Sequence, residues 1–235
     1  YVIDDDIDFE SKQLLRFSVK NARMNSDVEF LKINKEFFTN VVISDRIPET
    51  AYYRIAIPEL FRGTEVERIL YMDCDMIALQ DISKLWRLDF GDSIVAAVED
   101  AGFHQRLEKM EISAKSTRYF NSGLMLINVK KWLDENITQK VLDFIEHNPE
   151  KLRFHDQDAL NAILHDRWLP LHPRWNAQGY IMAKAKKHPT AAGEREYEET
   201  RNNPYIIHFS GHVKPWSKDF EGPTKKYYEK YAGMT

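Results

Sequence analysis

Nearly continuous apolar runs most constrain what this chain can fold into. Two of them, "RILYMD" at 68–73 and "SIVAAVED" at 93–100, end in acidic residues, and "GLMLINV" at 123–129 and "YIIHFS" at 205–210 have the same character. Such runs are typical of strands that are covered on both faces. Because helical stretches separate them, they predict an α/β fold with a mixed, mainly parallel central sheet flanked by helices.

The remaining segments fit this fold class. Apolar residues recur at roughly helical spacing over 8–24 and over 156–165, whereas 28–33 alternates as a strand does. A further helical stretch at about 50–62 contains Pro58, which predicts a break or a helix in two short parts. The chain has 235 residues and no linker rich in Pro, Gly or Ser, so we expect a single domain over 1–235.

Composition excludes some partners without assigning a function. The formal net charge of -4 gives no global field that would attract nucleic acid or anionic lipid. No apolar run is long enough to predict a transmembrane segment. The single cysteine, Cys74, excludes an internal disulfide and fits a reducing compartment, so we expect a cytoplasmic protein. A basic cluster around Lys184, Lys186 and Lys187 is most simply a solvated surface.

Two carboxylates lie one residue apart at the end of the run "ILYMDCD". Ligand sites in α/β sheets lie beyond the carboxyl ends of the strands, which is where Asp73 and Asp75 fall. Both cannot stay ionised in proximity without a raised pKa or a compensating cation, so a divalent metal is the economical interpretation. Oxygen ligands favour magnesium, calcium or manganese. Alternation along the strand should turn Cys74 away from both carboxylates, into packing.

A third candidate ligand is His208, at the end of the apolar run "YIIH". A lone histidine on an apolar strand is more often a core residue than a ligand, but Gly211 and Lys214 follow it closely. Gly211 would allow close backbone approach to a ligand, and Lys214 would supply a point charge suited to phosphate. A histidine in the shell tilts the choice of metal toward manganese. A metal and a lysine together suit the stabilisation of a departing diphosphate.

Four ordered motifs, "LYMDCD", "YFNSGLMLINVKKW", "HDQDALN" and "IHFSGHVKPW", resemble the retaining sugar-nucleotide glycosyltransferases of glycosyltransferase family 8. That family contains bacterial lipopolysaccharide galactosyl- and glucosyltransferases, glycogenin and galactinol synthase. The likeness runs from about Tyr53 to Trp216. It implies a GT-A type fold. It also implies metal-dependent transfer of a hexose from UDP-glucose or UDP-galactose to a glycan, a glycoprotein or a lipid-linked saccharide.

The same resemblance implies roles for individual residues. Manganese, with magnesium as the alternative, would be bound by Asp73, Asp75 and His208, while Asp73, Gly211 and Lys214 would contact the diphosphate. Arg54 matches an arginine that contacts the donor sugar or phosphate. The catalytic candidates Asn121, Asp156 and Gln157 match positions that hold the donor sugar hydroxyls and line the reactive face. Retention of configuration could proceed through a covalent intermediate or through same-face attack, and no nucleophile is assigned.

The chain departs from the family pattern at its start. Family members usually begin with a strand whose Asp/Asn-containing segment holds the uracil and ribose, followed by a helix. "YVIDDDID" resembles the second strand of the family instead. We therefore expect that the first strand and helix are missing and that the chain is part of a longer protein. Its flanks could then carry a peripheral membrane contact.

One other function remains as an alternative, and the residues disfavour a second. A catalytically inactive sugar-nucleotide or glycan-binding domain of the same fold would keep every ligand and bind without turnover. A phosphatase with an aspartyl nucleophile in Asp-x-Asp would need a threonine or similar small residue two positions after the second acid. This chain has Ile77 there, and that function would leave His208 unexplained.

Overall fold

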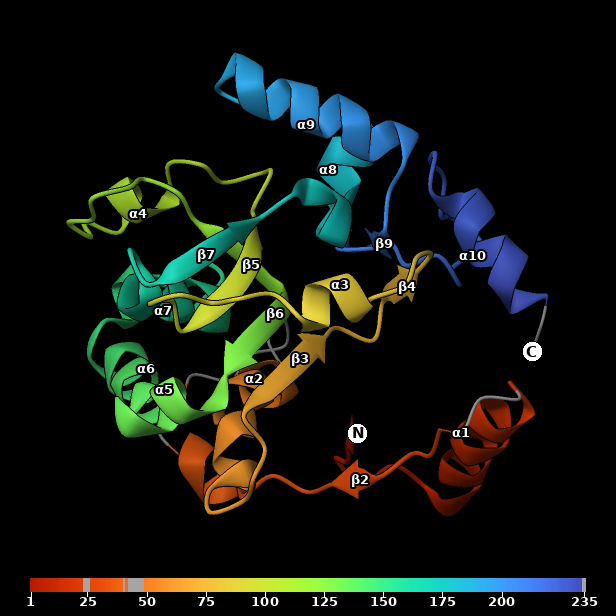
Figure 1. Ribbon diagram of the computed structural model, residues 1–235, viewed down its shortest axis with the longest axis horizontal. Coiled ribbons are helices and arrows are strands. Elements are labelled where there is room, and N and C mark those ends of the chain that lie inside the picture. Colours follow the sequence, from red (N-terminus) through yellow and green to blue (C-terminus); the bar gives the residue numbers. More distant parts are fainter. Residues whose placement is uncertain (23–25, 40, 42–48, 234–235) are drawn as a thin grey trace.

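A four-stranded sheet lies at the centre of the structure, a computed structural model that describes residues 1–22, 26–39, 41 and 49–233 (Figure 1). Its strand order is β3-β6-β5-β7, and a three-stranded sheet β4-β9-β8 and a two-stranded sheet β1-β2 accompany it. The strands are β1 Val2–Ile3, β2 Phe30–Leu31, β3 Arg68–Met72, β4 Met76–Ala78, β5 Val95–Glu99, β6 Phe120–Asn128, β7 Trp168–Leu171, β8 Ala177–Gln178 and β9 Ile206–His208.

The α/β class and the mixed sheets are confirmed, but the expectation of mainly parallel strands is wrong. In the four-stranded sheet, β3 and β5 both run antiparallel to β6, and β5 runs parallel to β7. In the smaller sheet, β9 is antiparallel to β4 and parallel to β8. The error has a physical cause: β6 is buried from Phe120 to Ile127. A strand covered on both faces has a continuous apolar sequence whatever the direction of its neighbours.

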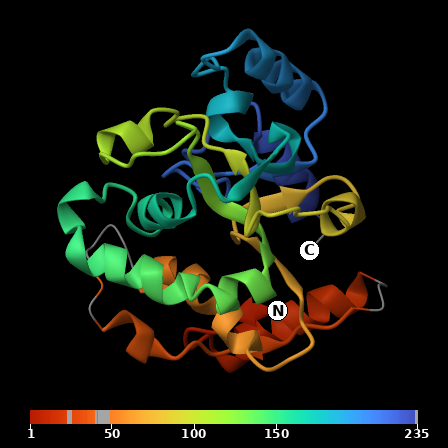
Figure 2. The ribbon, with the colours of Figure 1, turned by 60° about the vertical axis from the view of Figure 1, so that its left-hand side comes forward.

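Helices pack around these sheets (Figures 1 and 2). The α-helices are α1 Phe9–Asn21, α2 Tyr53–Ala56, α3 Ser83–Trp86, α4 Arg106–Lys109, α5 Val129–Asp134, α6 Ile137–His147, α7 His155–Leu164, α8 Gly179–Met182, α9 Ala191–Asn202 and α10 Lys225–Ala232. Short 3-10 helices are η1 Lys35–Phe38, η2 Glu49–Tyr52, η3 Ile57–Phe61, η4 Pro149–Lys151 and η5 Pro173–Asn176. None of the helices in the described ranges combines the length and apolar character that a bilayer span requires.

Two helical predictions have different outcomes. The stretch at 50–62 is broken, as predicted, into η2, α2 and η3, and Pro58 lies at the start of η3. Helix α1 forms within the predicted 8–24, capped by Asp8, whose side chain accepts a hydrogen bond from the backbone N–H of Ser11. Its apolar side chains do not face a core in this structure, because Phe9 and Phe17 are exposed and no residue of α1 is buried.

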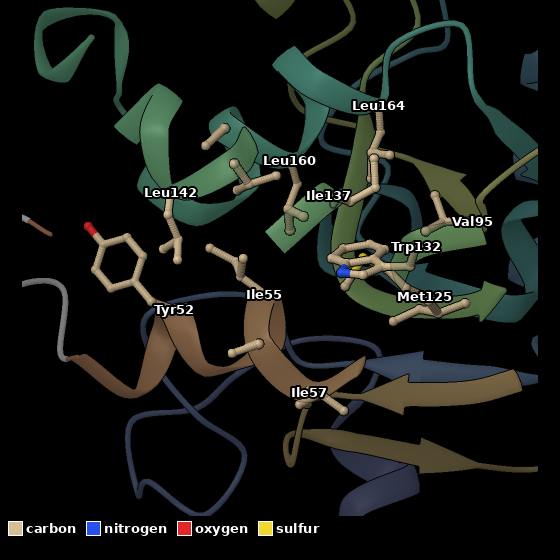
Figure 3. Packing of buried hydrophobic residues seen from close by; sticks show 14 of the residues in the cluster. Tyr52, Ile55, Ile57, Val95, Met125, Trp132, Ile137, Leu142, Leu160 and Leu164 are labelled. Atoms are coloured by element: carbon tan, nitrogen blue, oxygen red, sulfur yellow. The ribbon is translucent and has the colours of Figure 1, made fainter. Parts of the chain in front are cut away.

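The main core lies between β6 and helices α2, α5, α6 and α7 (Figure 3). Trp132 of α5 is fully buried there, and its indole Nε1 donates a hydrogen bond to the Thr138 hydroxyl at 2.9 Å. That hydroxyl donates in turn to the carbonyl oxygen of Ile55 at 3.1 Å. The polar atom of a large buried ring is thereby satisfied. The contacts tie α5 and α6 to α2, which carries Arg54 toward the candidate site.

Candidate active site

Strand pairing brings the predicted metal ligands together. Asp73 and Asp75 occupy the short link between β3 and β4, and the backbone N–H of Asp73 donates to the carbonyl of Gly123 at 2.8 Å. His208 ends β9 and pairs in register with Met76, the first residue of β4. Its Nε2 atom lies 3.4 Å from Asp75 Oδ1 and 3.8 Å from Asp73 Oδ2. One ligand atom from each of the three residues lies within 4.8 Å of the others.

A chain of buried hydrogen bonds sets the tautomer of His208. The carboxylate of Asp100 can only accept, so the Asn121 amide that reaches it at 3.0 Å must donate through Nδ2. Asn121 Oδ1 therefore accepts from Asn176 Nδ2 at 2.9 Å. Asn176 Oδ1 then faces His208 Nδ1 at 2.9 Å, which has to donate. In neutral His208 the Nε2 lone pair is consequently free and points at the two carboxylates.

This arrangement fits a divalent cation. Asp75 Oδ1 is buried and has no hydrogen-bond partner among the described residues. A lone pair of His208 and oxygens of two carboxylates converge on the same space, and these groups repel one another unless a positive charge lies between them. Two carboxylates and one imidazole make a ligand set suited to manganese and related first-row ions. The donor set and the orphaned oxygen thus agree with the predicted metal site.

Lys214 joins this cluster, but Gly211 does not. Lys214 Nζ lies 2.6 Å from Asp75 Oδ2 and also donates to the carbonyl of Phe209 at 3.0 Å. Burial works to raise the pKa of Asp75, but His208, when its ring carries both protons, and Lys214 outweigh burial and hold this pKa at about 2. Gly211 lies in an exposed turn, and a Cβ added there would meet only the Val213 carbonyl oxygen, at 4.0 Å. Its approach to a ligand remains a prediction.

Arg54 links the metal cluster to α7. Its Nη2 lies 3.2 Å from Asp73 Oδ1, and its Nε lies 3.1 Å from Asp156 Oδ2. The guanidinium also lies 5.0 Å from the centre of the Tyr71 ring, whose hydroxyl donates to Asp73 Oδ1 at 2.6 Å. Burial raises the pKa of Asp156 to about 6, although Arg54 opposes this rise. Arg54, whose side chain is 13% exposed, therefore bridges two carboxylates.

The amide side chains Asn121 and Gln157 bond to neighbouring protein groups. Gln157 Oε1 accepts from the backbone N–H of Ser122 at 3.0 Å and from Asn121 Nδ2 at 3.3 Å. Gln157 Nε2 donates to Asp100 Oδ2 at 3.1 Å. These bonds fasten the start of β6 to the first turn of α7. The predicted contacts of Asn121 and Gln157 with donor sugar hydroxyls remain predictions.

Two residues of the site were not predicted from the sequence, and the expected placement of a third was wrong. Asp100 ends the apolar run "SIVAAVED" just as Asp73 ends its own run, so its position carried a usable signal. Asn176 lies in a short 3-10 helix with no motif around it, and only the fold reveals its bond to His208. Cys74 is exposed, so the expectation that it packs is wrong, although it remains outside the ligand cluster.

Gly123 leaves no room for a side chain beside Asp73 and His208. A Cβ at this position would lie 2.5 Å from His208 Cε1 and 2.8 Å from Asp73 Oδ2. We expect Gly123→Ala to displace both ligands and weaken Mn²⁺ binding by about 10- to 100-fold, as seen when the groups that orient metal ligands are lost. Isothermal titration with Mn²⁺ measures this change. The matched control is Gly179→Ala, where a Cβ meets no atom within 4 Å. An unchanged Mn²⁺ affinity in Gly123→Ala would contradict the ligand assignment.

Comparison with known proteins places these features in a family. The model of "Glycosyl transferase family 8" matches residues 1–219. General stress protein A of Bacillus subtilis (strain 168) is 46% identical over 237 residues, which cover 100% of this chain and 82% of that protein. Lipopolysaccharide 1,2-glucosyltransferase of Escherichia coli (strain K12) is 29% identical over 180 residues, and the match covers 76% of this chain and 52% of that protein.

A solved structure has the same fold. The galactosyltransferase LgtC, crystallised with donor and acceptor sugar analogs, superimposes with a TM-score of 0.75 at 25% identity. The match covers 89% of this chain and 76% of LgtC. This likeness confirms the predicted GT-A type fold.

Proposed function

Because the chain belongs to glycosyltransferase family 8 and is a glycosyltransferase, we propose that it moves a hexose from a UDP-sugar to a saccharide acceptor with a bound divalent metal and with retention of configuration. Manganese is the proposed metal. The names of two similar proteins, a glucosyltransferase and a galactosyltransferase, make UDP-glucose and UDP-galactose the donors to test first.

The observation that carries this proposal is the convergence of Asp73, Asp75 and His208. The Nε2 lone pair of His208 faces two carboxylates, one of which has an orphaned buried oxygen. The diphosphate is the part of a UDP-sugar that a cation held there would bind. Lys214, within 2.6 Å of Asp75, adds a second positive charge at the same place.

The proposed division of labour follows from these positions. Asp73, Asp75 and His208 would hold the metal, which when bound supplies positive charge to the leaving diphosphate. Lys214 would exchange its contact with Asp75 for a phosphate oxygen, adding charge stabilisation as UDP departs. Arg54 would hold the carboxylate of Asp156 in place from α2.

Asp156 is the group that could support a covalent route. Its buried carboxylate is more basic than that of a free aspartate, because burial raises its pKa to about 6. Gln157, by contrast, is a poor nucleophile, and its Oε1 already accepts hydrogen bonds from Asn121 and Ser122. We propose that Asn121 and Gln157 orient the donor sugar through the rigid frame that they form.

One experiment tests the proposal against the inactive binding domain. UDP release is followed with a panel of UDP-sugars in Mn²⁺, in Mg²⁺ and in EDTA, with and without candidate acceptors. We expect release with a UDP-hexose that depends on Mn²⁺ and disappears in EDTA. Metal-independent release would contradict the assigned site. Calorimetric binding of UDP-sugar without any release would favour the inactive domain.

A further inference from the structure

Basic side chains form a band around α4 and η4. Lys109, Lys151 and Arg153 line a hollow of about 340 Å³ beside α4 and η4. Lys186 extends the band, because its Nζ lies 5.1 Å from the centre of the Phe103 ring and the Arg153 guanidinium lies 5.6 Å from the same centre. We call these four cations the basic rim.

Aromatic rings position two of the rim cations without neutralising them. Lys186 Nζ lies 5.1 Å from the centre of the Tyr180 ring and donates to the carbonyl of Gly102 at 2.7 Å. The Arg153 guanidinium lies 5.2 Å from the centre of the Phe154 ring. Neither cation forms an ion pair within the described part of the chain. Cation–π contacts hold a charge in place but leave it able to attract an anion.

The other charges of the hollow do not cancel the rim. Arg106 also lines the hollow, but its Nε and Nη2 atoms donate to the two carboxylate oxygens of Asp158 at 2.9 and 2.7 Å. We therefore leave Arg106 out of the rim. Glu111 and Glu150 are the carboxylates among the lining residues. With Arg106 paired, three cations face two carboxylates, so the lining keeps one excess positive charge although the whole chain has a formal net charge of -4.

Segments of the rim adjoin segments that carry residues of the candidate active site. Phe154 directly precedes the first turn of α7, which carries Asp156 and Gln157. On the other side, Tyr180 packs against Gly102, where an added Cβ would lie 2.9 Å from the Tyr180 ring and 3.3 Å from Asp100 Oδ1. Asp100 is the same carboxylate that Gln157 bonds at 3.1 Å. Phe154 and Gly102 therefore join the rim to the segments that carry Asp156, Gln157 and Asp100.

We propose that the acceptor is a saccharide that carries a phosphate group and that the basic rim binds this phosphate. An arginine fork together with lysine point charges is suited to phosphate oxygens. Tyr180 is 40% exposed, and we expect its aromatic ring to contact a sugar unit of the same ligand. The inference rests on the proposed function and names the class of its acceptor.

Matched ligands and variants test the rim. Calorimetry in the presence of UDP and Mn²⁺ compares maltose, maltose 6′-phosphate and inorganic phosphate on the wild-type chain, on Arg153→Gln, on Lys186→Gln and on the double variant. We expect the phosphorylated sugar to bind at least about tenfold more tightly than maltose. Each single variant should lose about fivefold and the double variant more, with maltose binding unchanged. The control is Lys130→Gln, an exposed lysine of α5 outside the rim.

Several results would overturn the proposal. Equal binding of the two sugars, or full phosphate preference in the double variant, would remove the rim as an acceptor site. Binding to vesicles rich in phosphatidylglycerol but not to maltose 6′-phosphate would make the rim a membrane contact instead. UDP release distinguishes the two proposals. If the chain releases no UDP but still prefers maltose 6′-phosphate to maltose, only the proposed function is contradicted. If it releases UDP normally but binds both sugars equally, only the proposal for the rim is contradicted.

Discussion

Replacing Asp75 with asparagine is expected to lower kcat/KM for UDP release by about 10³-fold while the chain stays folded. The change keeps the shape of the side chain but removes the negative charge that His208 Nε2 faces at 3.4 Å and Lys214 Nζ contacts at 2.6 Å. Loss of the metal forfeits several kcal/mol of charge stabilisation, and about 4 kcal/mol corresponds to that factor in rate.

The measurement is UDP release across UDP-sugar concentrations, together with Mn²⁺ titration by calorimetry. A matched control is Asp92→Asn, an exposed acid distant in sequence from the ligands, which should retain full activity. Far-UV circular dichroism establishes that both variants fold. If Asp75→Asn kept its Mn²⁺ affinity and turnover, the three-residue metal site would be refuted.

Local sequence patterns could predict the proposed metal ligands but not what orients them. Asp73 and Asp75 stand at the end of an apolar run, and His208 ends another, so each carries its own signal. Their meeting depends on the antiparallel register of β4 with β9, which places Met76 opposite His208. The motif resemblance implied this meeting. Residue spacing alone could not predict that these residues meet, because the packing of the whole sheet determines which strands pair and in which register.

The supporting residues were less accessible because their partners are distant in sequence. Asn176 matters only through bonds to His208 and Asn121, and nothing in "HPRWNAQGY" indicates either bond. Strand direction was misjudged for a related reason, since continuous burial hides the alternation that marks a strand with one solvated face. Helix α1 illustrates the converse: its periodicity was readable, but where its apolar side chains pack was not.

Asp158→Asn is expected to lower the free energy of unfolding by about 3–5 kcal/mol, the usual effect of breaking a buried ion pair. The Asp158 side chain is 0% exposed and pairs with Arg106 through both oxygens. It also accepts from the Tyr119 hydroxyl at 2.7 Å and from the backbone N–H groups of Arg153 and Phe154 at 2.6 and 2.7 Å. An asparagine would turn an NH₂ group toward some of these donors and leave Arg106 without its counter-charge.

Urea denaturation followed by tryptophan fluorescence measures this loss. The control is Asp134→Asn, which removes an exposed ion pair with Lys130 within α5 and should change stability by at most about 0.5 kcal/mol. Equal midpoints for the two variants would show that the Arg106 pair does not hold this region. Because Asp158 fixes the backbone just before Asp156 and Gln157, its loss should also reduce UDP release below the temperature at which the variant unfolds. Activity lost in proportion to the unfolded fraction alone would mean that Asp158 supports the fold without positioning the site.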